Sequence, residues 1–157
     1  MITNIEDFLE IRKKIKEKNQ NIIFTNGCFD IIHRGHIEYL NEAKSLGDIL
    51  IVGLNSDYSV RILKGEKRPV NKELDRAAVL DNIKSVDYVI IFGEETPYEL
   101  IKKVIPDILV KGSDWTIDNI VGKDIVEAAG GTVQTIVFVP NRSTTNIIQK
   151  IAHSGIQ

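Results

Sequence analysis

Several features that would narrow the class of this protein are scarce or missing. The chain of 157 residues has one cysteine, one tryptophan and three histidines. A single cysteine cannot form an intramolecular disulfide or a multi-cysteine metal site. No apolar run approaches the ~20 residues that a membrane-spanning helix needs. The start, MITNIEDFLE, is acidic where a signal peptide would be basic. We therefore expect a cytoplasmic protein with no membrane partner.

A positive charge excess is also missing. Lysine and arginine total 20 against 22 aspartates and glutamates, which gives a net charge of −2 and a pI near 5.9. This balance gives no electrostatic footprint for nucleic acid, so no nucleic-acid partner is expected. No repeat or linker divides the chain. The length suits one core, so we predict a single domain over 1–157, with a leading helix in 1–20 and an α/β core in 21–157.

Short apolar runs alternate with segments of helical spacing along the rest of the chain. These runs are rich in β-branched residues and lack strict alternation, which indicates strands that are buried on both faces of a parallel sheet. The predicted strands are 21–25, 48–54, 87–92, 107–111 and 132–139. The pattern predicts a Rossmann-like, doubly wound five-stranded parallel sheet, whose ligands bind beyond the carboxyl ends of the strands.

Several helix ends can also be predicted. An apolar stripe over 37–46 is followed by Gly47, which we expect in the left-handed conformation after the helix. The run VEAAGG predicts a similar end to a later helix. Thr96 precedes Pro97, and Glu99 follows three residues after Thr96, an arrangement typical of a capping box.

Two of the three histidines stand close together in the stretch TNGCFDIIHRGHIEYL, residues 25–40. Gly27 lies at the carboxyl end of the first predicted strand and lets a ligand approach the backbone. His33 falls in the following turn and His36 at the helix start, with Gly35 between them. The exposed N–H groups of a helix N-terminus attract anions. The stretch therefore predicts a phosphate site.

This stretch also has other interpretations. A zinc pair would favour i, i+4 spacing and a third ligand, whereas the spacing here is i, i+3 and His153 lies in the tail. We therefore predict no protein-held metal. The Walker phosphate loop and the G-x-G-x-x-G fingerprint are both missing. Spacing alone leaves open that the two histidines are ordinary structural residues, and Cys28 is expected to be a small buried residue.

The same stretch resembles the HxGH signature of the nucleotidylyltransferase superfamily, in its cytidylyltransferase-like branch. The residues in register are Gly27, Phe29, Asp30, His33, Gly35, His36 and Lys44. The resemblance implies the strand order 3-2-1-4-5. It also implies that His33 and His36 stabilise charge on the α-phosphate during in-line attack, and that Lys44 reaches back toward phosphate. A solvent-facing lysine is the alternative for Lys44.

Further segments over roughly residues 20–151 are similar, in order, to the bacterial D-glycero-β-D-manno-heptose 1-phosphate adenylyltransferases, the ADP-heptose synthases. This resemblance implies transfer of AMP from ATP to the sugar 1-phosphate, with Mg²⁺ accompanying ATP, in the biosynthesis of a lipopolysaccharide core precursor. In many bacteria such a domain is fused behind a sugar kinase. This sequence has no kinase segment, so we expect a stand-alone form whose heptose kinase is a separate chain. We also expect a homodimer. The alternatives are a glycerol-3-phosphate cytidylyltransferase, an FAD-synthetase-like enzyme and a non-catalytic nucleotide sensor.

The resemblance also assigns binding residues. Those expected at the nucleotide are Asn26, Gly27, Phe29, Asp30, Lys111, Gly112, Asp114, Arg142, Ser143, Thr144 and Thr145. Those expected at the phosphate acceptor are Lys64, Arg68 and Arg76, with Asp30 also able to orient that phosphate or a metal. The ordinary alternatives are N-capping hydroxyls at 143–145, a solvated loop at 63–71 and a Trp115 that covers apolar surface.

Overall fold

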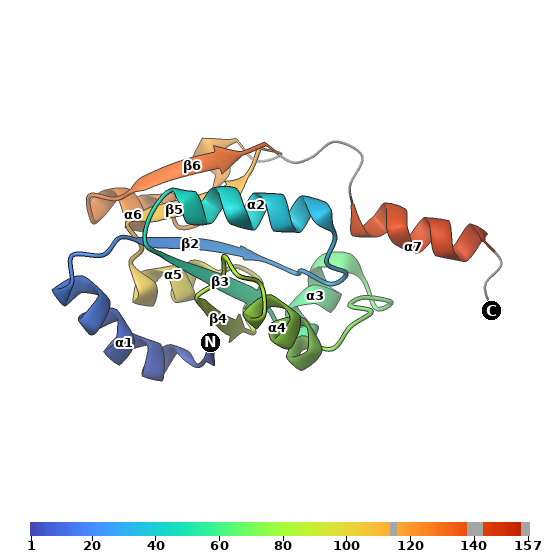
Figure 1. Cartoon of the computed structure of the whole chain (residues 1–157). Coiled ribbons are helices and arrows are strands. Elements are labelled where there is room, and N and C mark those ends of the chain that lie inside the picture. The colour runs from blue at the N-terminus through green and yellow to red at the C-terminus, as the bar shows by residue number, and fades with distance from the viewer. Residues whose placement is uncertain (114–115, 138–142, 155–157) are drawn as a thin grey trace.

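Parallel strands form the centre of the molecule (Figure 1). The computed structural model describes residues 1–113, 116–137 and 143–154. Within them, one six-stranded sheet has the order β1-β4-β3-β2-β5-β6, and every neighbouring pair is parallel. The strands are β1 (Ile2–Thr3), β2 (Ile22–Gly27), β3 (Ile49–Asn55), β4 (Tyr88–Phe92), β5 (Ile108–Gly112) and β6 (Thr132–Ile136).

The predicted count of five strands is wrong, because the described residues add a sixth strand at one edge. Strand β1 pairs with β4, with Ile2 opposite Val89 and Thr3 opposite Ile90. Such a short strand has no apolar run of its own and depends on a partner far along the chain. The five predicted strands correspond to β2 to β6, and their predicted order, 3-2-1-4-5, is confirmed.

Helices cover both faces of the sheet and connect the strands. They are α1 (Ile5–Glu17), α2 (Arg34–Ser45), α3 (Asp57–Lys64), α4 (Glu73–Asp81), α5 (Tyr98–Val104), α6 (Lys123–Ala128) and α7 (Thr144–His153), with a 3₁₀ turn at Ile117–Asn119. The predicted leading helix within 1–20 is confirmed as α1. Of these helices, none is both long and apolar enough to cross a bilayer, a finding limited to the described part of the chain.

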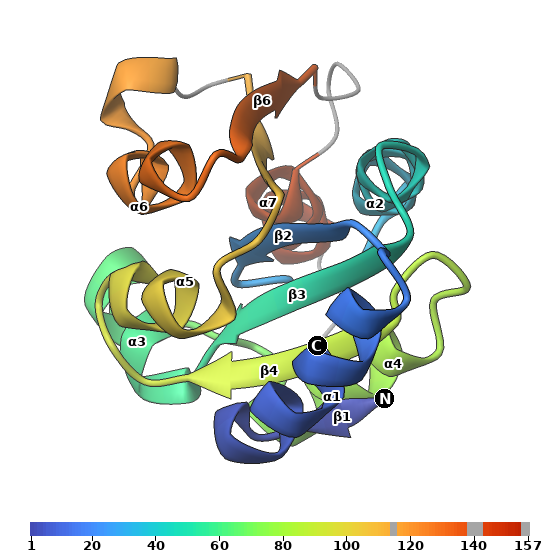
Figure 2. The same ribbon diagram turned by 90° about the vertical axis from the view of Figure 1, so that its left-hand side faces the viewer.

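Two apolar layers hold the helices against the sheet. On one face, side chains of α2 and α4, such as Leu40 and Leu80, pack on Leu50 and Val52 of β3. On the other face, α1, α5 and α6 pack on alternate strand residues such as Ile51. Figure 2 shows α2 and α5 on opposite sides of the sheet. This alternation is the physical reason that strands buried on both faces read as unbroken apolar runs.

Glycines end two helices in different ways. Gly130 follows α6 with a φ of +82°, which confirms the left-handed end expected of VEAAGG. Gly47 is not among the residues with positive φ, so that prediction is wrong. A Cβ at Gly47 would lie 2.5 Å from Cδ1 of Ile23, so close packing requires this glycine. The capping box at Thr96 is also wrong, because α5 begins at Tyr98 with Pro97 at its N-cap.

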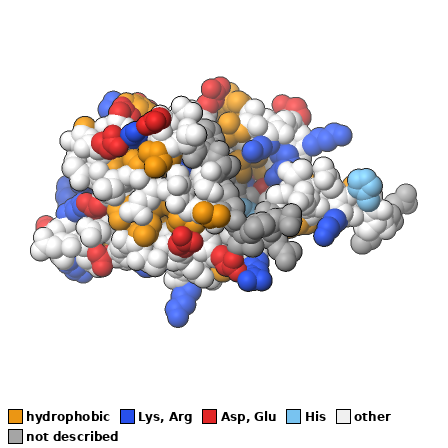
Figure 3. All heavy atoms as spheres, turned by 90° about the horizontal axis from the view of Figure 1, so that it is seen from above, with side chains coloured by type: hydrophobic (Ala, Val, Ile, Leu, Met, Phe, Trp, Pro, Cys, Tyr) orange, Lys and Arg blue, Asp and Glu red, His pale blue; other side chains and the backbone are white. Residues whose placement is uncertain are grey.

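Charged side chains of both signs are interspersed on the face seen in Figure 3. This distribution agrees with the small net charge of −2. It gives no broad single-sign surface on that face. A fold of this kind binds its ligands at the carboxyl edge of the sheet.

Candidate active site

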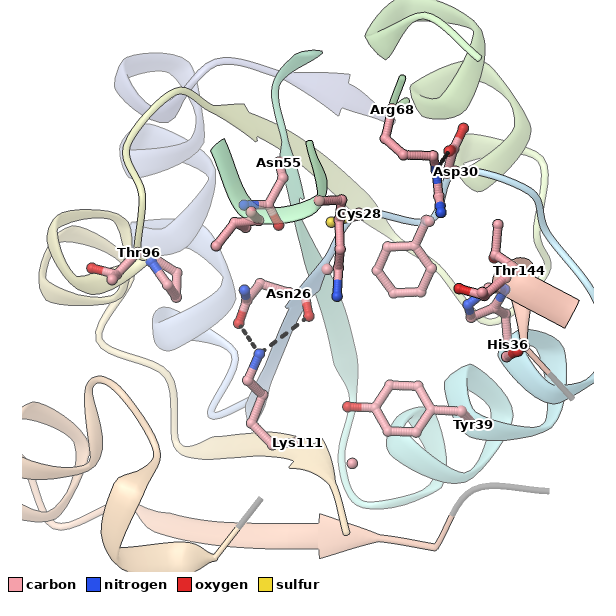
Figure 4. Close-up of a pocket in the computed structure, with 18 of the residues that line it drawn as sticks. Asn26, Cys28, Asp30, His36, Tyr39, Asn55, Arg68, Thr96, Lys111 and Thr144 are labelled. Atoms are coloured by element: carbon pink, nitrogen blue, oxygen red, sulfur yellow. Dashed lines mark hydrogen bonds and ion pairs between the residues drawn. The ribbon is translucent and has the colours of Figure 1, made fainter. Parts of the chain in front are cut away.

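A pocket of about 590 Å³ opens at the carboxyl ends of the central strands, beside the start of α2 (Figure 4). Thirteen of the predicted site residues line it: Asn26, Gly27, Phe29, Asp30, His33, His36, Lys64, Arg68, Lys111, Gly112, Ser143, Thr144 and Thr145. They come from four separate parts of the chain, 26–36, 64–68, 111–112 and 143–145, and only the fold brings them together. The pocket therefore lies where the sequence predicted the site, beyond the strand ends.

The turn between β2 and α2 is shaped by one unusual backbone conformation. Phe29 has a φ of +42° although it is not glycine, and such residues cost about 1–3 kcal/mol and cluster at functional sites. A Cβ on Gly27 would lie 3.0 Å from the Phe29 ring, so this glycine lets the ring fold back. The ring then contacts His36, with centroids 5.3 Å apart. Phe29 thus fixes the turn that carries both histidines.

The two histidines are stacked against each other at the N-terminus of α2. Their ring centroids are 3.9 Å apart and their planes 21° from parallel. The backbone N–H of His33 donates to Nδ1 of His36 at 3.4 Å, which leaves the proton of a neutral His36 on Nε2. Burial, and next the neighbouring charge of His33, lower the pKa of His36 to about 4. His36 is therefore neutral at pH 7 and presents an N–H donor.

The N-terminus of α7 reaches the same pocket. Ser143 is the N-cap of α7, and its hydroxyl accepts a hydrogen bond from the N–H of Asn146 at 3.1 Å. The ordinary capping role considered for Ser143 is thus confirmed. The hydroxyl of Thr144 donates to the carbonyl of Ile31 at 3.2 Å, which ties the start of α7 to the β2–α2 turn. Two helix N-termini therefore face one pocket, and each attracts negative charge.

Cationic side chains add to this attraction. The ammonium of Lys111 donates to Oδ1 of Asn26 at 2.8 Å and lies across the ends of β5 and β2. Arg68 and the exposed Lys64 lie on the segment after β3, and both line the pocket. Anionic groups such as phosphates are therefore the ligands that this pocket favours.

Asp30 holds the loop that follows α3. Its side chain is fully buried and accepts from Nε of Arg68 at 2.6 Å. It also accepts from the backbone N–H groups of Val70 and Asn71 at 2.8 and 2.9 Å. Burial raises the pKa of Asp30, but these backbone N–H groups and Arg68 outweigh burial and hold the pKa below its ordinary value. Both carboxylate oxygens are thus engaged within the protein, rather than directed at an acceptor phosphate or a metal.

Lys44 is not brought to the pocket. Its ammonium binds the carboxylate of Asp87 and the carbonyl of Asp48. Lys44 lies in the last turn of α2, about 12 Å along the helix axis from His36, given a rise of about 1.5 Å per residue. The structure therefore contradicts the expected reach toward phosphate, and Lys44 joins α2 to the start of β4.

Arg76 is also not at the acceptor. Its side chain is fully buried and donates to the carbonyls of Cys28, Asn55 and Asn71 at 2.6, 2.8 and 3.0 Å. It also pairs with Asp57 at 2.9 Å. The expected contact with a substrate is therefore wrong, because the guanidinium holds together the three backbone segments whose carbonyls it binds. Two other predicted residues, Asp114 and Arg142, lie outside the described residues, as does Trp115.

The pocket also contains residues that the sequence did not single out as binding residues. They are Cys28, Tyr39, Asn55, Leu63, Glu95, Thr96, Pro97 and Val121. Asn55 and Glu95 each follow an apolar run, and the rule that ligands bind beyond strand ends could have found them. Cys28 is half-buried, not fully buried as expected. Burial is the main reason that the pKa of its thiol is raised, which disfavours a nucleophilic thiolate.

The pocket offers no cage for a resident metal ion. Within the ranges that the structure describes, no group of three or more histidine, cysteine, aspartate or glutamate side chains could hold one. Asp30 has both oxygens engaged, which leaves Glu95 as the other carboxylate of the described lining. A divalent cation would need other oxygen ligands, and phosphate oxygens are suitable ones.

Comparison with known proteins agrees with this arrangement. A family model described as cytidylyltransferase-like matches residues 24–151. A bifunctional protein HldE of Geobacter metallireducens is 53% identical over 150 residues, which cover 96% of this chain and 31% of that protein. HldE of Wolinella succinogenes is 50% identical over 153 residues, covering 98% of this chain and 31% of the relative. The chain thus spans about a third of the length of these relatives.

Solved structures show the same fold. A lipopolysaccharide core biosynthesis protein from Thermoplasma volcanium is 32% identical and superposes with a TM-score of 0.64, covering 76% of this chain and 97% of that one. A pantoate-beta-alanine ligase from Francisella tularensis has a TM-score of 0.65 at 19% identity and covers 98% of this chain and 77% of its own. The second likeness is one of fold alone.

Proposed function

The chain belongs to the cytidylyltransferase-like family and is a nucleotidyltransferase, and we propose that it transfers AMP from ATP to D-glycero-β-D-manno-heptose 1-phosphate. The products would be ADP-heptose and pyrophosphate. The observation that carries this proposal is the meeting of two helix N-termini, those of α2 and α7, at one pocket beside the stacked histidines. The positive charge at this pocket attracts both a triphosphate and a sugar phosphate.

The reaction is a direct displacement. An oxygen of the sugar phosphate attacks the α-phosphorus of ATP, and the bond from that phosphorus to the oxygen of the departing pyrophosphate breaks. No covalent intermediate with the protein is required, because positioning and electrostatic stabilisation carry phosphoryl-type transfers. The Nε2–H of His36 would donate to an α-phosphate oxygen as its charge grows. The hydroxyl of Thr145 and the backbone N–H groups at the start of α7 would bind the outer phosphates.

Mg²⁺ would enter with ATP as part of the substrate. The described residues form no metal cage, and Mg²⁺ commonly takes most of its ligands from phosphates and water. When bound, it would neutralise charge on the departing pyrophosphate. Removal of the metal should therefore abolish turnover without changing the stability of the protein alone.

Similarity to known enzymes supports heptose 1-phosphate as the phosphate acceptor. The segments RPVN, ETP and VKGSD resemble the heptose enzymes more than the glycerol-3-phosphate cytidylyltransferases. A solved structure of 32% identity bears the description of a lipopolysaccharide core biosynthesis protein. The homodimer, the separate heptose kinase and the cytoplasmic location stay predictions.

One assay tests the proposal. Purified protein is mixed with ATP or CTP, with Mg²⁺, and with heptose 1-phosphate or glycerol 3-phosphate, and pyrophosphate release is measured. Release with ATP and heptose 1-phosphate is the expected result. Release with CTP and glycerol 3-phosphate alone would assign the protein to the competing enzyme. Nucleotide binding without release in any combination would make it a sensor and would overturn the proposal.

A further inference from the structure

The side of the pocket that faces the histidines has a different chemistry from the phosphate-binding side. Figure 4 shows Asn55 and Thr96 across the pocket from His36 and Thr144. Asn55 ends β3, and Thr96 lies between β4 and α5, next to Glu95. The helix N-termini and the cations described above do not account for these residues.

Asn55 presents a fixed hydrogen-bond acceptor. It is 3% exposed, and its Nδ2 donates to Oγ of Ser59 at 2.8 Å. Its backbone carbonyl is held by Nη1 of Arg76 at 2.8 Å. Among the described residues, Oδ1 of Asn55 has no hydrogen-bond partner. An amide oxygen that lines a pocket and has no partner within the described chain is available to accept a hydrogen bond from a ligand.

Glu95 presents a second acceptor, and this one is charged. It is exposed and, in the part of the chain that the structure describes, makes no ion pair. A carboxylate in a pocket that collects phosphates repels its own ligands. Such a residue lowers affinity unless it accepts hydrogen bonds from a ligand. The buried Pro97 two residues on, at the N-cap of α5, anchors the segment that carries it.

Phosphate groups cannot satisfy these acceptors, because an ionised phosphate offers few donors. Sugar hydroxyls donate readily and suit both an amide oxygen and a carboxylate. We propose that Glu95, Asn55 and Thr96 bind hydroxyl groups on the sugar of the phosphate acceptor, so that this side of the pocket selects a polyhydroxylated acceptor. The inference rests on the proposed function and names the residues that would give it its specificity.

The test compares Glu95→Gln with Glu94→Gln. Both substitutions remove one negative charge from neighbouring exposed positions, but Glu94 does not line the pocket. Pyrophosphate release with ATP is measured against a panel of sugar 1-phosphates that includes heptose 1-phosphate, and against glycerol 3-phosphate. For E95Q we expect kcat/KM for the best sugar 1-phosphate to fall about tenfold, as loss of a charged hydrogen bond to a hydroxyl should cause.

The same variant should leave other quantities unchanged. The KM for ATP should stay within about twofold of the wild type, because ATP binding does not depend on the hydroxyls of the phosphate acceptor. E94Q should match the wild type throughout. Thermal unfolding of E95Q should also be unchanged, because Glu95 holds no other part of the described chain.

The outcomes separate the two proposals. If the wild type uses no sugar 1-phosphate, the proposed function and this inference both fail. If it uses one but E95Q is as active as the wild type, only the inference fails. A lower KM for both substrates in E95Q would show that Glu95 merely repels anions, and a raised KM for ATP alone would place it at the nucleotide. Either of these results would overturn the inference.

Discussion

The imidazole of His36 stacks on that of His33 with ring centroids 3.9 Å apart. Two cationic rings at this distance would repel each other strongly, so the free enzyme can hold at most one added proton there. Burial works in the same direction and lowers the pKa of His36 to about 4. A bound triphosphate would oppose both effects, because negative charge favours the protonated ring.

The first prediction concerns the pH dependence of stability. Between about pH 6.5 and pH 4, the unfolded chain binds a proton at His36 and the folded chain does not. Stability should therefore be unaffected by this group above pH 6.5, and it should fall as the pH falls through this window. The shift corresponds to about 2 kcal/mol between pH 7 and pH 4.5. Urea unfolding of the wild type and of His36→Asn at the two pH values would measure it.

The difference between the two proteins isolates His36 from the carboxylates that titrate in the same range. H36N should lose about 2 kcal/mol less than the wild type on acidification. Equal losses would show that His36 titrates normally in the folded protein. Nuclear magnetic resonance of the ring nitrogens offers a direct check, since the wild-type ring should stay neutral down to about pH 5.

The second prediction concerns turnover. His36→Ala removes a donor aimed at the reacting phosphate, and we expect kcat to fall by ~10²-fold or more while the protein stays folded. His153→Ala is the matched control, because His153 lies near the end of α7, away from the pocket, where its ring contacts only the carbonyl of Gln149 among the described residues. A folded H36A variant with wild-type kcat would remove His36 from the mechanism.

The third prediction separates Lys44 from the chemistry. Lys44→Ala removes the ion pair to Asp87, in which each of the two side chains is about 30% exposed. Stability should fall by about 1 kcal/mol, and kcat should stay within about twofold of the wild type. Lys14→Ala, on the surface of α1, serves as the control for loss of a lysine. A large loss of kcat in K44A with unchanged stability would restore the catalytic role expected from the sequence.

The case of Lys44 shows where sequence reasoning stops. A motif gives the order of residues along a helix, but a side chain two turns away can point toward the ligand or toward a partner from another segment. The partner here, Asp87, is 43 residues along the chain, and no residue near Lys44 in the sequence indicates this contact. The same limit applies to β1, whose pairing with β4 joins the two ends of a long stretch of sequence.

Other parts of the site could be predicted because their cause is local or follows from topology. Gly27, His33 and His36 lie at the junction of one strand and one helix, so their proximity follows from the chain itself. The position of Thr144 near this junction could also be expected. Both segments follow predicted strands, and this fold forms its ligand site from the residues beyond the carboxyl ends of the strands. The internal use of Arg76 could not be predicted, because its partners come from two loops and from the end of β3, whose relative positions depend on packing.

The fourth prediction concerns Arg76. Arg76→Ala should destabilise the protein by about 3–5 kcal/mol, because it leaves Asp57 and buried carbonyls without their donor. Arg76→Lys keeps the charge but not the planar fork, so it should also destabilise the fold. Urea unfolding measures both variants. If R76K were as stable as the wild type and only the KM for the sugar phosphate rose, Arg76 would contact substrate after all.

The fifth prediction concerns Asp30, whose carboxylate accepts from Arg68 and from the N–H groups of Val70 and Asn71. Asp30→Asn replaces an acceptor oxygen with a donor that faces other donors. We expect a loss of about 2–3 kcal/mol in stability and faster amide hydrogen exchange at Val70 and Asn71. Because Arg68 loses its support, kcat/KM for the sugar phosphate should fall as well. Asp75→Asn, at an exposed position of α4, is the control for loss of charge.

The pH dependence of this effect distinguishes a loop anchor from a substrate contact. The folded-state pKa of Asp30 lies below its ordinary value of 3.8. Its stabilising effect should therefore be fully present above that value and should disappear as the pH falls through the lower folded-state pKa. The stability gap between the wild type and D30N should be constant near neutral pH and should close in strong acid. A carboxylate that served only to orient substrate would give no such gap in the free protein, and amide exchange in the loop would be the same in both.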